Sequence, residues 1–372
     1  MTRGKPVSFG VSSLMQKPPR GQLCLCVAAL ALFACSTTDN PPLDAGGAAG
    51  ALDAADVTPS PDVAVDDAAR ANADVNPDAA ASSDVAQRCT TSSGIMRGDD
   101  PPCIGTTLTI ADRPYCVHAP NDLSHDLPLV LLLHGYRASG QEQANYFGLD
   151  DLVEPRGFIL VKPNGVKNGL GQRFWNAFPA CCAVPNDPGL PDDVAYLTQV
   201  LDDVAKSFPV DSARVYVVGH SNGAFMTHRL ACDLSPRLAA VVSFAGAVDP
   251  TLCHPTRPIS VVEAHGTADD TILFGGGAVL PIFPSYVGVE ATLRFWAGAE
   301  GCGARSVVAT EDLVCDARND AETSVERYAG CTNGRAVELW KLVGQNHIPN
   351  FSLPTWPTRI LDFLFAQRLA TP

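Results

Sequence analysis

The stretch that most constrains the fold is residues 214–226, with the sequence RVYVVGHSNGAFM. Four apolar residues precede Gly219, as in a buried parallel strand. The pattern G-x-S-x-G follows, with Ser221 at its centre and Gly223 at its end. A helical pattern without Pro or Gly continues to Ala231. The stretch therefore predicts a strand, a sharp turn and a helix, with Ser221 exposed at the turn.

A serine in this position is typical of a nucleophile. G-x-S-x-G between a strand and a helix is the nucleophile elbow of α/β-hydrolases, where the two glycines permit a tight, closely packed turn. The same five-residue pattern also arises by chance in a Gly-rich chain. The flanking strand and helix patterns favour the elbow, so Ser221 is the candidate nucleophile.

Residues 89–372 alternate between strand-like and helix-like segments and predict one catalytic domain. The alternation indicates an α/β class, specifically the α/β-hydrolase fold with a mostly parallel central sheet flanked by helices. An antiparallel pair at residues 106–110 and 113–118 opens the domain. Besides the elbow, strands are expected at residues 127–134, 158–162, 239–244, 259–265 and 337–342. Helices are expected at residues 141–152, 192–208, 286–299 and 357–369.

The first 88 residues predict export and a tether. Residues 1–35 are basic, without acidic residues, and contain an apolar run too short to span a bilayer. They predict a secretory signal, and Cys35 follows a sequence similar to a bacterial lipoprotein signal, which would make it the lipidated first mature residue. Ordinary signal cleavage is the alternative. Residues 36–88, rich in Ala, Asp and Pro, predict a disordered linker because they cannot bury enough apolar area to offset the entropy of ordering.

Charge and cysteine content limit the partners and the compartment. The net charge of −14 argues against nucleic-acid binding, because an acidic chain repels phosphate. An even number of cysteines in an exported domain predicts disulfides, although the sequence leaves their pairing open. No C-x-x-C pair or His pair has ligand spacing, so we expect no metal site and no cofactor. The ten cysteines of the domain are Cys89, Cys103, Cys116, Cys181, Cys182, Cys232, Cys253, Cys302, Cys315 and Cys331.

Ser221 needs a base within hydrogen-bond reach and an acid that orients the base, because serine is a weak nucleophile at neutral pH. In the α/β-hydrolase fold the chain order is Ser, acid, His. Only His347, of the eight histidines, lies beyond the candidate acids. It follows the predicted strand 337–342 and precedes the final helix. His347 is therefore the predicted base, and a solvated loop histidine is the alternative.

The acid should follow a strand between the nucleophile and the base. Residues 259–265 are that strand, and their exit loop contains Asp269 and Asp270. A pair of turn-capping aspartates is the alternative without a catalytic role. The oxyanion needs backbone N–H donors that already point at it. We expect these from Asn222, directly after the nucleophile, and from Tyr136, in the loop after the strand 127–134.

Seven short stretches, spread over most of residues 115–350, carry a family resemblance. They are His134-Gly135-Tyr136, Phe174-Trp175-Asn176 with Cys181-Cys182, Asp192-Asp193-Val194, residues 210–216, the elbow, His265-Gly266-Thr267-Ala268-Asp269, and Tyr328-Ala329-Gly330-Cys331. Together they resemble the polyhydroxybutyrate depolymerase and feruloyl esterase group of secreted α/β-hydrolases. The elbow and the H-G-T-x-D stretch are the most specific of them.

The resemblance implies hydrolysis of carboxylic esters. It implies that Ser221, Asp269 and His347 occupy the positions of the family's triad, and it favours Asp269 over Asp270. Trp175 becomes a candidate for the substrate pocket, with core packing as the alternative.

The sequence therefore predicts an exported serine esterase, either a cell-surface or outer-membrane lipoprotein or a secreted protein. We expect a monomer that touches a membrane only through its N-terminal lipid anchor. The expected substrates are small-molecule, oligosaccharide or polyester esters that carry hydroxycinnamoyl, acetyl or short hydroxyalkanoate groups. Granular polyhydroxybutyrate should be a poor substrate, because residues 89–372 form one hydrolase domain without an appended binding module. The alternatives are a serine peptidase on the same fold and a non-catalytic surface-binding lipoprotein.

Overall fold

The computed structural model describes residues 100–182, 189–316 and 321–369. The predicted signal, with Cys35, and the predicted linker lie outside these residues. Within the described ranges, no helix is both long and apolar enough to span a bilayer.

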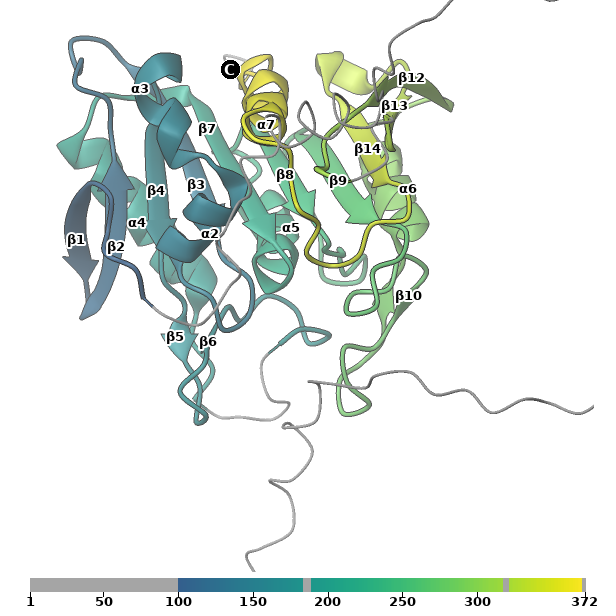
Figure 1. The fold of residues 1–372 in the computed structure, drawn as a ribbon, viewed down its shortest axis with the longest axis horizontal. Coiled ribbons are helices and arrows are strands. Elements are labelled where there is room, and N and C mark those ends of the chain that lie inside the picture. Colours follow the sequence, from purple (N-terminus) through teal and green to yellow (C-terminus); the bar gives the residue numbers. More distant parts are fainter. Residues whose placement is uncertain (1–99, 183–188, 317–320, 370–372) are drawn as a thin grey trace, which may run out of the picture. The chain divides into compact units, whose positions relative to one another are not determined.

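The described residues contain a ten-stranded sheet whose six central strands are parallel, as the sequence predicts (Figure 1). In spatial order the central strands are β4 (Ile159–Pro163), β3 (Leu127–Leu133), β7 (Val210–His220), β8 (Ala240–Phe244), β9 (Ser260–Gly266) and β14 (Val337–Leu342). Parallel strands end at the same edge of a sheet. The loops after β3, β7, β9 and β14, which contain the candidate site residues, therefore leave the sheet on one side.

Antiparallel strands extend the sheet at both ends. The predicted opening pair is confirmed as β1 (Thr106–Ile110) and β2 (Arg113–His118), and β2 joins β4. At the other end, β13 (Thr323–Tyr328) and β12 (Arg305–Glu311) follow β14. Neither β12 nor β13 was predicted from the sequence. The side chains of the outermost strand, β12, are largely exposed, so it lacks the apolar run that marks the central strands.

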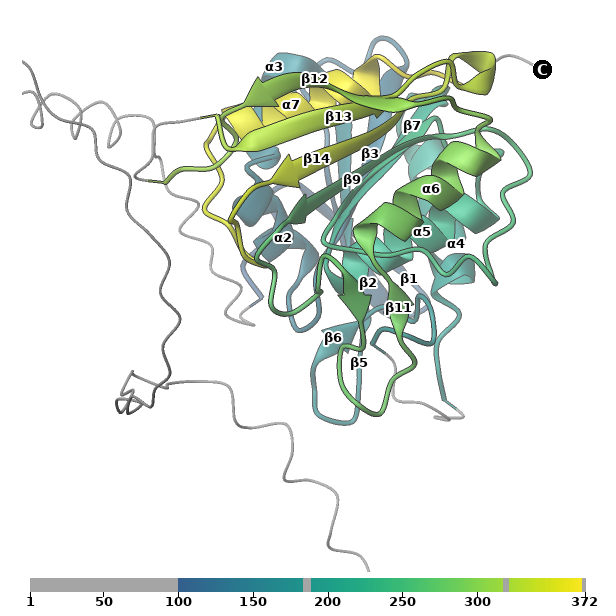
Figure 2. The ribbon, with the colours of Figure 1, turned by 90° about the vertical axis from the view of Figure 1, so that its right-hand side faces the viewer.

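Helices cover both faces of the sheet (Figure 2). One face packs against α4 (Asp193–Ser207), α5 (Asn222–Asp233) and α6 (Val289–Ala299), and the other against α2 (Gly140–Phe147) and α7 (Thr355–Phe365). Alternate residues of each strand feed the two layers. In β3, Leu129 and Leu131 enter the first core, whereas Val130 and Leu132 enter the second. Burial on both faces explains why the central strands are continuously apolar.

Three helix boundaries differ from the predicted ones. The helix expected at residues 141–152 ends at Phe147, because Gly148 takes a left-handed conformation (φ 71°) that caps it, and a short 3₁₀ turn and α3 (Val153–Arg156) follow. The helix expected from residue 286 begins at Val289, because Tyr286–Val287 forms β11. The final helix lies at Thr355–Phe365 rather than residues 357–369.

Two short hairpins lie at the same end of the sheet in both ribbon views (Figures 1 and 2). One pairs β5 (Val166–Lys167) with β6 (Arg173–Phe174), and the other pairs β10 (Gly276–Gly277) with β11. The first follows β4 in the chain and the second follows β9. They therefore flank the edge of the sheet from which the candidate site residues emerge.

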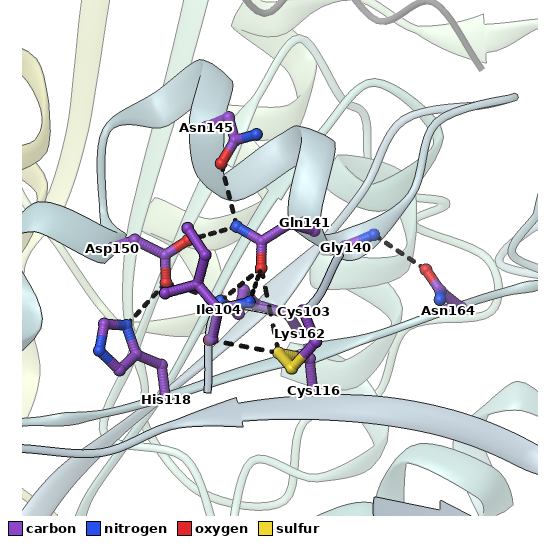
Figure 3. The surroundings of a disulfide bond; sticks show 10 residues. All are labelled: Cys103, Ile104, Cys116, His118, Gly140, Gln141, Asn145, Asp150, Lys162 and Asn164. Carbon is purple, nitrogen blue, oxygen red and sulfur yellow. Dashed lines mark hydrogen bonds and ion pairs between the residues drawn. A yellow bond between two sulfur atoms is a disulfide. The ribbon is translucent and has the colours of Figure 1, made fainter. Parts of the chain in front are cut away.

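Disulfides cross-link the described residues, as the cysteine count predicts. The pairs are Cys103–Cys116, Cys181–Cys182, Cys232–Cys253 and Cys302–Cys331, and Cys315 is also disulfide-bonded. The first pair attaches the segment before β1 to β2. Beside it, the buried Lys162 ammonium contacts the carbonyl oxygen of Ile104 and the side chains of Gln141 and Asp150, at 2.6–2.9 Å (Figure 3). A buried cation costs little only when it is paired and hydrogen-bonded, as Lys162 is here.

Candidate active site

Ser221 occupies a strained turn between β7 and α5. Its backbone has φ 56° and ψ −121°, a region that residues with side chains rarely adopt. Its N–H donates to the carbonyl oxygen of Phe244 in β8, at 2.9 Å. A Cβ on Gly219 would lie 2.2 Å from the Gly223 oxygen, and one on Gly223 would lie 2.3 Å from the Leu133 oxygen. Both glycines of the motif are therefore required by space.

The side chains of Ser221, His347 and Asp269 form one hydrogen-bonded chain. His347 Nε2 lies 2.9 Å from Ser221 Oγ, and His347 Nδ1 lies 2.7 Å from Asp269 Oδ2. These residues follow β7, β14 and β9, so the parallel strands bring together positions up to 126 residues apart. Asp270 is exposed, and its carboxylate contacts the neighbouring Thr271 hydroxyl at 3.3 Å. The geometry is that of a base hydrogen-bonded to a nucleophile and oriented by a carboxylate.

The Asp269 carboxylate is almost fully buried and well supplied with donors. Its Oδ1 accepts the backbone N–H groups of Thr271 and Ile272, at 2.9 and 2.8 Å. Burial by itself would raise the pKa of Asp269. The hydrogen bonds from His265 and His347 outweigh burial and hold this pKa well below its usual value. Asp269 is therefore a carboxylate at any pH at which a histidine can act as a base.

His220, inside the elbow motif, supports the loop that carries His347. Its Nε2 lies 3.1 Å from the His347 carbonyl oxygen, which can only accept, so Nε2 carries the proton. Burial and the neighbouring His347 lower the pKa of His220 to about 3, so the ring is neutral. Its face stacks on Phe244, with centroids 5.2 Å apart. His220 thus ties the elbow to the histidine loop.

The two predicted oxyanion donors follow the neighbouring strands β7 and β3. Asn222 is the first residue of α5, so its backbone N–H has no acceptor within the helix. Tyr136 follows β3 in the neighbouring loop. The side chain of Asn222 binds the backbone of Trp175. Its Oδ1 accepts the backbone N–H of Trp175 at 2.7 Å, and its Nδ2 donates to the backbone carbonyl oxygen of Trp175 at 3.0 Å. This pair of bonds attaches the segment after β6 to the elbow.

Trp175 is fully buried behind the site. Its indole N–H donates to the His134 oxygen at 3.0 Å, and its ring packs 4.9 Å from the His134 ring. Burial lowers the pKa of His134 to about 4, and its neutral ring accepts the Gly165 N–H at 2.9 Å. These surroundings favour the packing alternative for Trp175 over a side chain that lines an open pocket.

A group of polar residues on the far side of Asp269 was not predicted from the sequence. Glu263, His265 and His228 are buried there and hydrogen-bonded to one another. A signal was present in the sequence, because Glu263 lies between the apolar residues Val262 and Ala264 in the predicted strand 259–265. A carboxylate within a central parallel strand needs buried partners, and such a residue indicates a polar network. Within the described ranges, no group of three or more His, Cys, Asp or Glu is placed to hold a metal ion.

Comparison with known protein families identifies the family of the domain. The family model described as esterase PHB depolymerase matches residues 114–325, more than half of the 372-residue chain. The chain belongs to this esterase family. The match contains the elbow with Ser221, and it contains Asp269. His347 lies beyond its last residue.

Similar proteins include esterases of several kinds. The bifunctional acetylxylan esterase/xylanase XynS20E of Neocallimastix patriciarum is 25% identical over 240 residues, which cover 64% of this chain and 31% of that protein. Feruloyl esterase B of Piromyces equi is 25% identical, over 65% of this chain and 46% of its own length. The putative esterase NocK of Nocardia uniformis subsp. tsuyamanensis is 32% identical over 48% of this chain and 51% of its own length. The chain therefore spans about half or less of these relatives.

Among solved structures, the acetyl xylan esterase from Aspergillus awamori has the same fold. It superposes with a TM-score of 0.50 at 16% identity, over 70% of this chain and 98% of the other. At this identity the likeness concerns the fold alone. It agrees with the α/β-hydrolase architecture that the parallel sheet and its two helix layers define.

Proposed function

We propose that this protein is a serine esterase that hydrolyses carboxylic esters through an acyl-enzyme, with Ser221 as nucleophile, His347 as base and Asp269 as the orienting acid. The observation that carries the proposal is the hydrogen-bonded chain from Asp269 through His347 to Ser221, on a strained elbow. Membership of an esterase family supports the choice of esters over peptides.

In the first half of the proposed reaction, Ser221 Oγ attacks the ester carbonyl carbon while His347 Nε2 takes the hydroxyl proton. Asp269 stabilises the imidazolium that forms. The carbonyl oxygen becomes an oxyanion, which the backbone N–H groups of Asn222 and Tyr136 would stabilise. Collapse of this intermediate breaks the bond to the alcohol, which leaves with the proton from His347. The acyl group is then bonded to Ser221 Oγ.

In the second half, water replaces the alcohol. His347 Nε2 removes a proton from the water as it attacks the acyl carbonyl carbon. The second tetrahedral intermediate collapses, Ser221 Oγ leaves and regains its proton from His347, and the carboxylic acid is released. Both halves use the same base and the same oxyanion donors, which is why one constellation suffices.

Fluorophosphonate labelling tests the proposed mechanism, because this probe reacts with an activated serine. We expect the wild-type protein to be labelled at Ser221, and Ser221→Ala to remain unlabelled and to lose ester turnover by several orders of magnitude. Circular dichroism should show that both proteins are folded alike. Turnover within tenfold of wild type in folded Ser221→Ala would contradict the assignment.

The proposed substrates are small or oligomeric esters. The names of the relatives, acetylxylan esterase and feruloyl esterase, support acetyl and hydroxycinnamoyl esters of oligosaccharides. The family description, esterase PHB depolymerase, supports short hydroxyalkanoate esters as well. Product release from p-nitrophenyl acetate, methyl ferulate, acetylated xylo-oligomers, a peptide panel and polyhydroxybutyrate granules should be compared at equal enzyme concentration. We expect the first three to be turned over well and the granules poorly. Rapid clearing of the granules would overturn this substrate class.

We also propose that the protein is exported, as a lipoprotein anchored at Cys35. The disulfides among the described residues support an oxidising compartment. A diacyl anchor at Cys35 would hold the protein at the membrane, which a single acyl chain does only weakly. Cys35→Ser removes the site of this anchor and should therefore move the protein from the membrane fraction to the soluble one. A wild-type protein that is already soluble, with its first residue elsewhere, would favour ordinary signal cleavage.

A further inference from the structure

Glu263 is a fully buried carboxylate in the middle of the parallel sheet, and three donors surround it. Its Oε1 lies 3.2 Å from the Gly246 nitrogen and 2.9 Å from His265 Nδ1. Its Oε2 lies 2.9 Å from His228 Nε2, which comes from α5. The charges of Glu263, His265 and His228 depend on which of their atoms carry protons. The hydrogen-bond partners of each residue determine this.

Trp296 determines the state of His228. The Trp296 indole N–H, which can only donate, lies 3.1 Å from His228 Nδ1. His228 Nδ1 must therefore be an acceptor without a proton, and the ring is neutral with its proton on Nε2. That proton points at Glu263 Oε2. With the Gly246 N–H on the other oxygen, Glu263 is an acceptor on both sides and is ionised. The hydrogen bonds outweigh burial and hold the pKa of Glu263 below its usual value.

His265 faces acceptors on both of its ring nitrogens. Nδ1 meets the Glu263 carboxylate, and Nε2 lies 2.8 Å from the Ile272 carbonyl oxygen and 3.5 Å from Asp269 Oδ2. A carbonyl and an ionised carboxylate can only accept, so both nitrogens carry protons and His265 is an imidazolium. Burial lowers the pKa of His265, but the bonds to Asp269 and Glu263 outweigh it and raise this pKa to about 9.

We propose that Glu263 and His265 form a buried positioning pair, in which Glu263 anchors His265 and the positive charge of the His265 ring faces Asp269, where it opposes protonation of His347. The inference rests on the proposed esterase mechanism and adds a role for two residues outside the triad. His265 also donates to the oxygen of Ile272, whose N–H binds Asp269. The pair therefore acts on the triad carboxylate both through charge and through the loop that carries it.

The geometry places the charge close to the base. His265 Nε2 and His347 Nδ1 contact the same oxygen, Asp269 Oδ2, at 3.5 and 2.7 Å, so they lie no farther apart than the sum of these distances. A second cation at this separation opposes protonation of His347. For a separation of about 6 Å and an effective dielectric constant of about 40, the charge of His265 alone would displace the protonation of His347 by roughly one pH unit. The Glu263 carboxylate, 2.9 Å from the opposite ring nitrogen of His265, reduces this displacement.

Among the described residues, the buried titratable side chains around Asp269, other than Glu263, His265 and His347, are uncharged. From α2, the pKa of Tyr146 is raised well above its usual value by burial and by Asp269, and from β11 the pKa of Tyr286 is raised mainly by burial. From β7, His220 is neutral because its pKa is lowered to about 3. From α5, His228 is neutral because its Nδ1 accepts the Trp296 N–H. His265 is thus the cation among these neighbours of Asp269.

Two variants test the charge directly through the pH profile of kcat/KM for p-nitrophenyl acetate. In His265→Gln, the amide retains an N–H for the Ile272 oxygen but has no charge. In Glu263→Gln, His265 loses the carboxylate that keeps it protonated. We expect the acidic limb to move to higher pH by roughly 0.5 to 1 unit in His265→Gln, because His347 then protonates more readily. The limb of Glu263→Gln should move less, because this substitution also removes the negative charge of Glu263. On the alkaline side of the limb, kcat should fall more than KM rises.

The matched control is His118→Gln. His118 also pairs with a carboxylate, Asp150, at 2.8 Å, but this pair belongs to the cluster around Lys162 in Figure 3. Its acidic limb should coincide with that of the wild type. A purely structural role for His265 predicts that the amide preserves the loop and leaves the limb in place. An unchanged limb in folded His265→Gln would therefore overturn the proposal.

A measurement on the wild-type protein keeps the proposal testable even where the variants do not fold. Nitrogen NMR of ¹⁵N-histidine-labelled protein at pH 7.5 should show His265 protonated on both ring nitrogens and His228 as a neutral Nε2–H tautomer. A neutral His265 would contradict the inference. Failure of the esterase proposal would look different, because the wild-type protein would then neither turn over esters nor react with the fluorophosphonate.

Discussion

Asp269 and Asp270 are adjacent in the chain, yet their carboxylates have different surroundings. The Asp269 side chain is buried, accepts two backbone N–H groups and meets His347, whereas Asp270 is exposed to solvent. In the tight turn after β9, the side chains of Asp269 and Asp270 point in different directions. Sequence and family resemblance favoured Asp269, and the structure shows what distinguishes the two residues physically.

At this scale we predict unequal effects for two identical substitutions. Asp269→Asn should lower kcat by about 10³- to 10⁴-fold, because an amide cannot stabilise the imidazolium and favours the wrong tautomer. Asp270→Asn, the matched control, should stay within about twofold of wild type, because surface changes of this kind have small effects. Steady-state kinetics on p-nitrophenyl acetate measure both. If Asp270→Asn were the more damaging, the wrong neighbour would have been assigned.

A second residue-scale prediction concerns stability and pH. The folded-state pKa of His265, about 9, lies above the ordinary value of about 6.5, so the folded protein holds this proton more tightly than the unfolded chain. The resulting stability is fully present below pH 6.5 and is lost as the pH rises through 9. Between pH 6 and pH 9.5 the wild type should therefore lose about 3 kcal/mol more than His265→Gln.

Urea unfolding of both proteins at the two pH values measures this difference. Ionisation of tyrosines in the unfolded chain weakens both proteins equally and cancels in the comparison. Parallel stability curves for wild type and variant would show that His265 is not held as a cation.

At the scale of elements, the strand, turn and helix around Ser221 depend on two close approaches of the backbone. Gly219 packs against α5, and Gly223 packs against the end of β3. The residue between them, Ser221, has a positive φ that the surrounding hydrogen bonds maintain. Strain at Ser221 is thus supported by packing in two neighbouring elements.

We expect Gly223→Ala to destabilise the protein by about 2–3 kcal/mol and to reduce kcat at least tenfold, because the new methyl group would force β3 and α5 apart. Gly298→Ala is the matched control on an exposed face of α6, where a Cβ meets nothing within 4 Å. It should stabilise the protein by up to about 1 kcal/mol, the difference in helix propensity. Urea denaturation and turnover of p-nitrophenyl acetate check both. A neutral Gly223→Ala would contradict the packing argument.

At the scale of the whole domain, disulfides connect elements that lie far apart in the chain. The pair Cys232–Cys253 links the end of α5 to the loop after β8 across 21 residues, and Cys302–Cys331 links the end of α6 to the loop after β13 across 29 residues. Both pairs cross-link segments that neighbour the strands carrying the site. They restrict the unfolded chain more than the folded one.

Replacing both members of one pair, Cys232→Ser with Cys253→Ser, should lower the free energy of unfolding by about 3 kcal/mol, from the entropy of a loop of this length. The corresponding fall in Tm is roughly 5–10 °C for a domain of this size. Differential scanning calorimetry under oxidising conditions measures it. A Tm within about 1 °C of wild type would show that the bridge adds no stability.

Several features followed from the sequence because their causes are local. A buried parallel strand is apolar along its whole length, and an elbow needs glycine on either side of the serine, so the central strands and Ser221 are readable from consecutive residues. Chain order alone singled out His347. The ends of helices were predicted less accurately. The helix α2 ends early because Gly148 takes a left-handed φ, and the sequence does not reveal that single dihedral angle.

The tertiary structure decided what depends on distant contacts. It added β12 and β13, which form strands because β13 pairs with β14 and β12 pairs with β13, and not because of an apolar pattern. It paired the cysteines, oriented Asp269 toward His347 and surrounded Glu263 with donors from three segments. The periodicity of a sequence reports which face of an element is buried. Which partners meet there is determined by the stacking of strands and helices, because hydrogen bonds and charges act over a few ångströms in space regardless of separation in the chain.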